Sequence, residues 1–175
     1  MKHTVFNGRY YKFIIDDGWE YIEPSGFDDV VVIIPVTNDD KLVLVEQYRV
    51  PAGGQVIELP AGLIGDLDEH DGEDILEAAD RELIEETGYH ASKMEIVADG
   101  PPSAGSNTLS VKMILATDLR KVGEGGGVAG ESIKVHEVPL DEVRERLEGF
   151  IDQGFVVDLK IYGGVWFAEH IGGKR

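Results

Sequence analysis

Three glutamates whose spacing suits metal chemistry stand in the middle of this 175-residue sequence: Glu82, Glu85 and Glu86. They fall within a segment from about Asp71 to Gly88 that has helical periodicity and an apolar stripe formed by Ile75, Leu76, Ala79 and Leu83. At ~100° per residue, Glu82 and Glu86 lie within ~60° of the centre of that stripe, and Glu85 lies on its flank. Carboxylates one turn apart repel each other, and partial burial makes the repulsion worse. A bound divalent cation would compensate for it, and oxygen-only ligands with partial hydration favour Mg²⁺, with Mn²⁺ as the alternative.

The acidic segment allows two other interpretations. The cluster could be a solvated face, since Arg81 can pair with Glu77 or Glu85 at helical spacing, although one cation cannot neutralise the whole cluster. A calcium loop of the EF-hand kind at Asp66–Gly72 is disfavoured, because its glycine comes one position late and His70 would be the fifth ligand.

The charge balance limits the partners of the chain. It has 34 Asp and Glu against 16 Lys and Arg, a formal charge of −18, which argues against binding nucleic acid or an anionic membrane. A phosphate substrate would therefore need metal cations or a local basic patch. With no Cys, the chain has no disulfide framework and no thiol nucleophile. The absence of an apolar signal core and of any stretch near ~20 apolar residues predicts a cytoplasmic protein.

The elements that must position the glutamates follow from hydrophobic periodicity. The continuous apolar run Val30–Thr37 is typical of a strand buried on both faces, and Gly88 is well placed to end the glutamate helix. Gly123–Gly130 holds five glycines in eight residues and is predicted to be an irregular, mobile loop. Further strands are expected at Tyr10–Ile15, Trp19–Glu23, Lys41–Tyr48, Met94–Ala98, Val111–Ala116 and Ser132–Val138, and further helices at Pro139–Gly149 and Phe155–Ile171, the last weakened by Gly163 and Gly164.

The glutamate segment resembles the signature box of the Nudix hydrolases. That box consists of Gly, five residues, Glu, seven residues and then Arg-Glu-aliphatic-any-Glu-Glu-any-Gly-aliphatic. Arg81–Tyr89 fits every fixed position except the last, where Tyr89 replaces an aliphatic residue. Ten residues rather than five separate Gly62 from Glu73, and the additional residues lie in the acidic loop Gly65–Gly72. Because insertions in surface loops cost little, the helix need not move.

The resemblance implies an α/β fold, the Nudix α/β/α sandwich around a mixed sheet, for residues 30–175. Residues 1–29 would form an N-terminal strand extension. Their Tyr, Phe and Trp residues need a surface to cover, and the branch that this chain resembles uses its N-terminal strands in a homodimer. We therefore expect a homodimer that depends on residues 1–29.

The flanks of the box are similar to those of the branch that acts on ADP-ribose and other nucleoside diphosphate sugars. Leu44–Arg49 resembles the strand whose arginine contacts substrate, and Glu58–Gly62 resembles the entry to the box. Glu131–Glu137 resembles the late loop and strand that supply an additional acid. Ser103–Gly105 reads Ser-Ala-Gly where the branch commonly has Ser-Pro-Gly, which favours a broader range of sugar nucleotides.

The implied reaction is attack of water at phosphorus across a pyrophosphate, giving a nucleoside monophosphate and a sugar phosphate. The resemblance assigns the metal to Glu82, Glu85, Glu86 and the carbonyl of Ala61. Glu131 is the expected general base, with Glu85 as the alternative. Substrate contacts are expected from Arg49, Trp19 and Ser103.

Simpler roles stay open for three of these residues. Glu131 could be a solvated loop acid, Arg49 could form a surface salt bridge, and Trp19 could belong to a core or a dimer interface. At the level of function, two alternatives also stay open. One is a Nudix hydrolase of nucleoside triphosphates or dinucleoside polyphosphates, and the other is a non-catalytic Nudix-fold nucleotide sensor.

Overall fold

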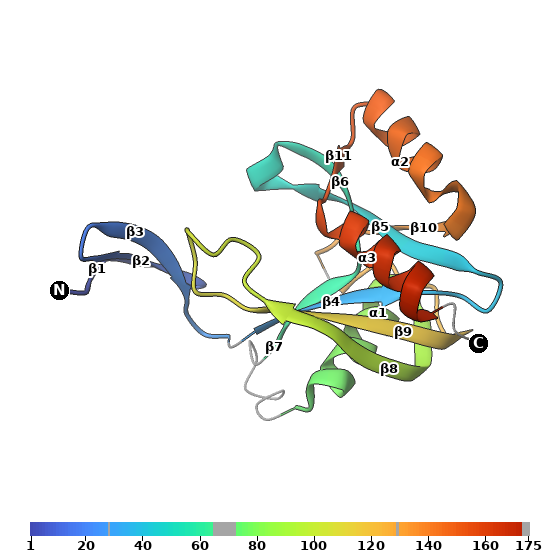
Figure 1. The fold of residues 1–175 in the computed structure, drawn as a ribbon, viewed down its shortest axis with the longest axis horizontal. Helices are drawn as coiled ribbons and strands as arrows, with labels where there is room; N and C mark the ends of the chain where they lie inside the picture. The colour runs from blue at the N-terminus through green and yellow to red at the C-terminus, as the bar shows by residue number, and fades with distance from the viewer. Residues whose placement is uncertain (28, 65–72, 129, 173–175) are drawn as a thin grey trace.

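The chain folds around strands that pair between distant parts of the sequence (Figure 1). The computed structural model describes residues 1–27, 29–64, 73–128 and 130–172. The strands are β1 (His3–Asn7), β2 (Tyr11–Asp16), β3 (Trp19–Pro24), β4 (Asp29–Pro35), β5 (Lys41–Arg49), β6 (Gly54–Glu58), β7 (Ala61–Ile64), β8 (Tyr89–Gly100), β9 (Val111–Lys121), β10 (Lys134–Pro139) and β11 (Val156–Val157). The helices are η1 (Val50–Ala52), α1 (Ile75–Thr87), η3 (Leu140–Glu142), α2 (Val143–Asp152), α3 (Lys160–Phe167) and the π-helical turn η4 (Ala168–Gly172).

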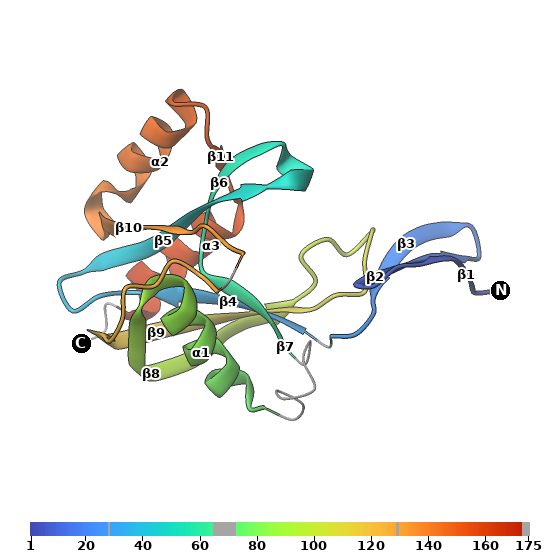
Figure 2. The same cartoon turned by 180° about the vertical axis from the view of Figure 1, so that it is seen from behind.

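The apolar run that predicts a doubly buried strand forms β4, which lies in a sheet of order β7-β4-β9-β8. Successive side chains of a strand point to opposite faces. Val31 and Ile33 pack in the cluster beneath α1, whereas Val32 and Ile34 pack in the cluster beneath α2 and α3. The two opposite views of the ribbon show α1 on one side of the strands and α3 on the other (Figures 1 and 2). This confirms the α/β arrangement with helices on both faces.

The strands form two main sheets rather than one. After the turn at Asp40, which has a φ of 56°, the chain continues as β5 in a second sheet of order β10-β5-β6-β11. Just beyond the end of β4, the chain pairs with β5 through an isolated bridge between Val36 and Leu42 and a hydrogen bond from the Thr37 N–H to the Lys41 carbonyl. Both sheets are mixed, because β4 pairs with β9 and β6 with β11 in parallel while the other neighbours are antiparallel.

Helix α1 begins at Ile75, where the side chain of Asp74 accepts a hydrogen bond from the N–H of Leu76 at 2.9 Å. It ends at Gly88, whose φ of 74° is the left-handed conformation that glycine adopts without steric cost, as predicted. Residues 65–72, which include the box insertion and the rejected calcium loop, lie outside the described residues.

The prediction of one helix over Phe155–Ile171 is wrong in its first part. Val156 and Val157 instead pair in parallel with β6, and α3 begins only at Lys160. Gly164 allows close packing of α3, because a Cβ there would lie 2.8 Å from Leu59 Cδ1 and 3.5 Å from Ile34 Cγ1 of β4. At Gly164 the cost in helix propensity is therefore offset by the close approach of α3 to β4.

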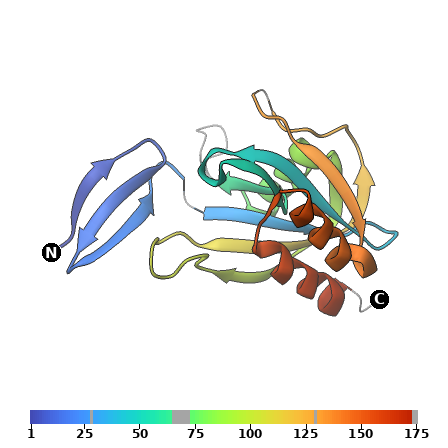
Figure 3. The ribbon, with the colours of Figure 1, turned by 90° about the horizontal axis from the view of Figure 1, so that it is seen from above.

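The first three strands form a separate antiparallel sheet that projects from the rest of the molecule (Figure 3). Backbone hydrogen bonds join it to the loop before β9, with Ile22 donating to Ser106 and accepting from Thr108. Phe6 and Trp19 are each 66% exposed on this sheet. Within the described residues, the structure contains no helix with the length and apolar character needed to cross a bilayer.

Candidate active site

A cavity of ≈ 700 Å³ lies where α1, β5, β7 and the loop before β10 meet. The structure brings most of the predicted site residues to this cavity. Its lining includes Arg49, Ala61, Glu82, Glu85, Glu86 and Glu131, together with Tyr10, Val30, Gln47, Gly62, Leu63, Arg81 and Val128. Four carboxylates and two guanidinium groups therefore face one space.

The carboxylate of Glu82 lies directly against the backbone at Gly62. A Cβ at position 62 would overlap the Glu82 carboxyl carbon and Cγ, so a larger residue here would displace the Glu82 side chain from its present position. The glycine of the box therefore keeps its place beside α1 despite the longer spacing that follows it.

Arg81 is the cation of this cluster. Its Nη1 lies 2.8 Å from Glu82 and 3.5 Å from Glu85, and its Nη2 lies 3.3 Å from Glu73. The sequence predicted pairing with Glu77 or Glu85, and the structure shows the Glu85 pair but adds Glu73 and Glu82. One guanidinium group thus compensates three acids and leaves an excess of negative charge.

Glu86 is the most deeply buried of the glutamates, with 6% of its surface exposed, in agreement with its position on the helical wheel. Burial raises its pKa to about 8, and the neighbouring charges of Glu82 and Glu131 act in the same direction. The N–H of Ala61 donates to Glu86 Oε2 at 3.3 Å and partly opposes this shift.

Arg49 reaches the cavity from the end of β5. Its Nε donates to Glu58 Oε2 at 2.8 Å, and 43% of its side chain is exposed. Burial raises the pKa of Glu58, whereas the charge of Arg49 opposes the rise. Arg49 therefore has a salt bridge and also faces the cavity.

Glu131 approaches the cavity from the glycine-rich loop. Its Oε2 accepts a hydrogen bond from the N–H of Val128 at 3.0 Å. Its charge contributes to the raised pKa of Glu86, as expected for two acids that face one cavity.

Trp19 and Ser103 do not line this cavity. Trp19 and Tyr21 instead line a separate pocket of ≈ 220 Å³ against residues 104–108. The Ser103 hydroxyl lies 2.7 Å from that of Ser106 and is exposed. Their assignment to substrate binding stays a prediction.

Tyr10 and Gln47 line the site although the sequence did not single them out. Tyr10 lies in the turn between β1 and β2, and this turn lies next to the cavity. The aromatic residues around Tyr10 carry no periodic signal that distinguishes it from its neighbours. Gln47 is buried in β5, two residues before Arg49, and this same-face spacing was a usable signal.

The donor set fits a divalent cation in its chemistry. Among the described residues, no three acidic or histidine side chains are grouped closely enough to hold an ion as they lie. The contacts explain this, because Glu82 and Glu85 turn toward Arg81 while Glu86 turns toward Ala61. The all-oxygen donors, their excess negative charge and the raised pKa of Glu86 nevertheless match what a hard divalent cation requires.

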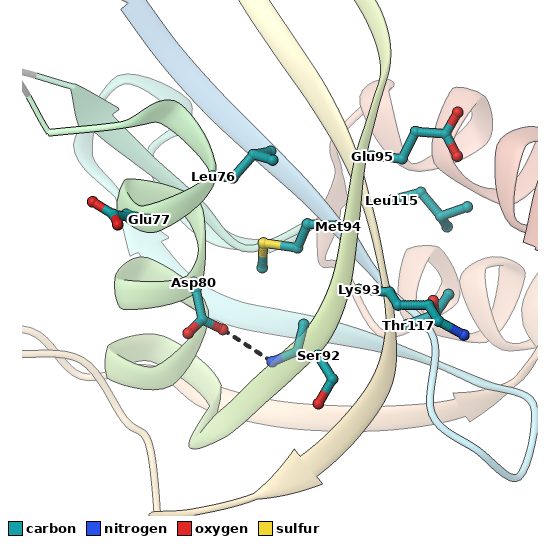
Figure 4. A pocket seen from close by; sticks show the side chains of 10 residues that line it. Leu76, Glu77, Asp80, Ser92, Lys93, Met94, Glu95, Leu115 and Thr117 are labelled. Atoms are coloured by element: carbon teal, nitrogen blue, oxygen red, sulfur yellow. Dashed lines mark hydrogen bonds between the residues drawn. The ribbon is translucent and has the colours of Figure 1, made fainter.

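A second cavity, of ≈ 660 Å³, opens between α1 and the edge strand β8 (Figure 4). Met94 and Leu76 face each other across it, and Asp80 points from α1 to β8. Asp80 accepts a hydrogen bond from the N–H of Ala91 at 2.9 Å and lies 2.7 Å from His90 Nδ1. These contacts fasten α1 to β8 beside this cavity.

The fold and the first cavity together define an α/β protein whose acidic site is carried by one helix. The family described as NUDIX domain matches residues 27–156. The chain therefore belongs to the Nudix family and is a Nudix hydrolase, a class of enzyme that uses divalent metal ions.

Two curated relatives span most of the chain. It is 32% identical over 155 residues to the methanol dehydrogenase activator of Bacillus methanolicus, covering 82% of this chain and 79% of the relative. It is 28% identical over 157 residues to the ADP-ribose pyrophosphatase of Bacillus subtilis (strain 168), and the match covers 84% of this chain and 80% of that relative. A crystal structure of an ADP compounds hydrolase superposes with a TM-score of 0.66 at 22% identity, covering 89% of this chain and 95% of that one, which supports the fold.

Proposed function

We propose that the protein is a Mg²⁺-dependent pyrophosphohydrolase that cleaves nucleoside diphosphate sugars such as ADP-ribose. The observation that carries the proposal is the single cavity that combines Glu82, Glu85, Glu86 and Glu131 with Arg49. The similarity to a protein named ADP-ribose pyrophosphatase supports the substrate class.

Glu82, Glu85, Glu86 and the Ala61 carbonyl would hold the cation. When bound, Mg²⁺ or Mn²⁺ supplies positive charge that neutralises the diphosphate and acidifies water. This charge also accounts for how a chain of −18 binds a polyanion. Arg49 adds a positive charge from the end of β5, where it binds a phosphate or the terminal sugar.

The chain's own residues then move one proton. Water attacks one phosphorus atom of the anhydride, forming a new P–O bond while the bridging P–O bond breaks. Glu131 accepts the proton of the attacking water, with Glu85 as the alternative acceptor. The products are a nucleoside monophosphate and a sugar phosphate.

The proposal includes a homodimer in the cytoplasm, with the sheet of residues 1–24 at the interface. The exposed aromatic side chains of that sheet support this arrangement. In such a dimer Trp19 of one protomer could contact substrate bound by its partner, which would give Trp19 its predicted role.

The substrate class is tested by comparing specificity constants under identical Mg²⁺. We expect cleavage of ADP-ribose and of at least one other nucleoside diphosphate sugar, with ATP a poor substrate because its third phosphate must occupy the space of a neutral sugar. Excess chelator should abolish activity. If ATP or a dinucleoside polyphosphate is the better substrate, the family assignment stands and the proposed branch fails. Binding without turnover would indicate a sensor.

The role of Glu131 is tested by Glu131→Gln, which keeps the shape of the side chain and removes its basicity. We expect kcat to fall by about 100- to 10,000-fold with little change in KM. Glu95→Gln, an exposed acid of β8 that does not line the cavity, is the matched control. Near-normal turnover of the Glu131 variant would assign the base to Glu85 or Glu124.

A further inference from the structure

The C-terminal end of α1 is capped by one stretch of chain, residues 121–127, which we call the cap segment. The last carbonyl groups of an α-helix have no partner inside the helix and must be satisfied from outside. Four consecutive carbonyl groups are satisfied here by the cap segment. In order, the pairs are Gly127 N–H to the Glu85 carbonyl (3.0 Å), Gly126 N–H to the Glu86 carbonyl (2.9 Å), Lys121 Nζ to the Thr87 carbonyl (2.7 Å), and the Val122 and Gly123 N–H groups to the Gly88 carbonyl (2.8 and 3.1 Å).

Glycine is required where the cap segment touches the helix. Gly125 has a φ of 71°, and a Cβ there would lie 2.7 Å from the Glu86 carbonyl oxygen and closer still to the Thr87 carbonyl carbon. At Gly88 a Cβ would overlap the Gly123 carbonyl. Because these neighbours are backbone atoms, they cannot move aside as a flexible side chain could. The glycines therefore serve close packing on α1.

The same backbone leads directly to Glu131. The N–H of Val128, next to Gly127, donates to Glu131 Oε2, and the Val128 carbonyl accepts from the N–H of Glu131, both at 3.0 Å. A Cβ on Gly127 would lie 2.6 Å from Glu131 Oε2. A short chain of backbone contacts thus joins the carbonyl groups of Glu85 and Glu86 to the carboxylate of Glu131.

We propose that the cap segment sets the position of Glu131 relative to Glu85 and Glu86, and that Gly125 is a positioning residue for the reaction. Acids that act on one phosphorus atom need fixed separations, and a misplacement of ~1 Å can cost ~100-fold in rate. The kinetic consequence rests on the proposed function, because it assumes that Glu131 takes part in catalysis. The capping itself does not depend on that assumption.

The kinetic test compares Gly125→Ala with Gly53→Ala. Gly53 has nearly the same backbone conformation, with a φ of 66°, but open space where a Cβ would stand. Both variants therefore carry similar strain, and only the first displaces the cap segment. We expect Gly125→Ala to lower kcat by about 100-fold with KM within about threefold of wild type, and Gly53→Ala to keep wild-type kcat. Equal kcat in the two variants would overturn the positioning role.

A second measurement is independent of activity. In the metal-free wild-type protein, NMR hydrogen exchange should show slow exchange of the Gly126 and Gly127 amides, because both are bonded to α1. Rapid exchange of both would overturn the proposal. If the wild type hydrolyses no sugar nucleotide while these amides are protected, the proposed function fails and the cap stands.

Discussion

At the scale of the single residue, Glu86 lowers the stability of the folded protein but has a use in the chemistry of the site. Glu86 is held in a buried, negatively charged position where its proton is retained up to about pH 8. Such a group lowers the stability of the folded protein whenever it must ionise without a partner. This loss of stability is consistent with a side chain whose proton is replaced by a bound cation.

Replacing Glu86 should therefore change the pH dependence of stability. Between its ordinary pKa of 4.5 and about 8, the folded chain keeps a proton that the unfolded chain has released. The free energy of unfolding then falls as pH rises, by at most ~1.4 kcal/mol per unit. We expect Glu86→Gln to remove this loss and to lower turnover by orders of magnitude while the fold survives.

The measurement is the Tm of both proteins in excess chelator from pH 5 to 9. The wild-type Tm should decline more steeply than that of the variant, and the two curves should separate toward pH 8. Parallel curves would show that Glu86 is not the group responsible.

Among the elements, α1 is fixed at both ends and along one side. Asp74 caps its beginning, Gly88 its end, and Asp80 bonds to β8 (Figure 4). Tyr89, which stands where the box has an aliphatic residue, donates from its hydroxyl to Glu137 Oε1 at 2.5 Å and so joins the start of β8 to β10. Burial and the charge of Glu137 raise the pKa of Tyr89 to about 12, so it remains a donor throughout the physiological range.

The contact between Asp80 and β8 gives a prediction for stability. Asp80→Ala leaves the Ala91 N–H, in a residue that is 7% exposed, without its acceptor. We expect a loss of ~1–3 kcal/mol in the free energy of unfolding, measured in urea. Glu77→Ala, an exposed acid one turn earlier on α1, is the control and should change it by less than about 0.5 kcal/mol. If both variants lost the same free energy of unfolding, the effect would come from removing a negative charge from α1 and not from the hydrogen bond to Ala91.

The sequence predicted elements whose signal is local. The doubly buried β4 and the capped helix α1 each carry their pattern within one segment. The two-residue strand β11 exists only because it pairs with β6, and β6 and β7 are short and contain glycine, so none of the three has a readable period. The glutamates were found from their spacing, whereas Tyr10 enters the site through tertiary structure alone.

At the scale of the whole molecule, the sheet of β1–β3 exposes several large apolar side chains. Its exposed apolar side chains include Val5, Phe6 and Trp19. The proposed homodimer would cover them.

Deleting residues 1–29 should convert the proposed dimer to a monomer, because the deletion removes the apolar interface. Phe6→Glu should weaken it with the fold intact, and Leu159→Glu, at an 81% exposed position of the body, should not. Light scattering at micromolar concentration gives the mass of each. A fully active wild-type monomer would contradict the prediction.

Strand β4, which contributes to both hydrophobic clusters, also affects how the molecule unfolds. Its side chains belong alternately to the cluster under α1 and to the cluster under α2 and α3. Because β4 contributes to both clusters, we expect the body to melt as one cooperative unit, and calorimetry should give calorimetric and van't Hoff enthalpies that agree. Among the described strands, β1, β2 and β3 form a sheet of their own that shares no strand with the body, so we expect its melting to be separable from that of the body.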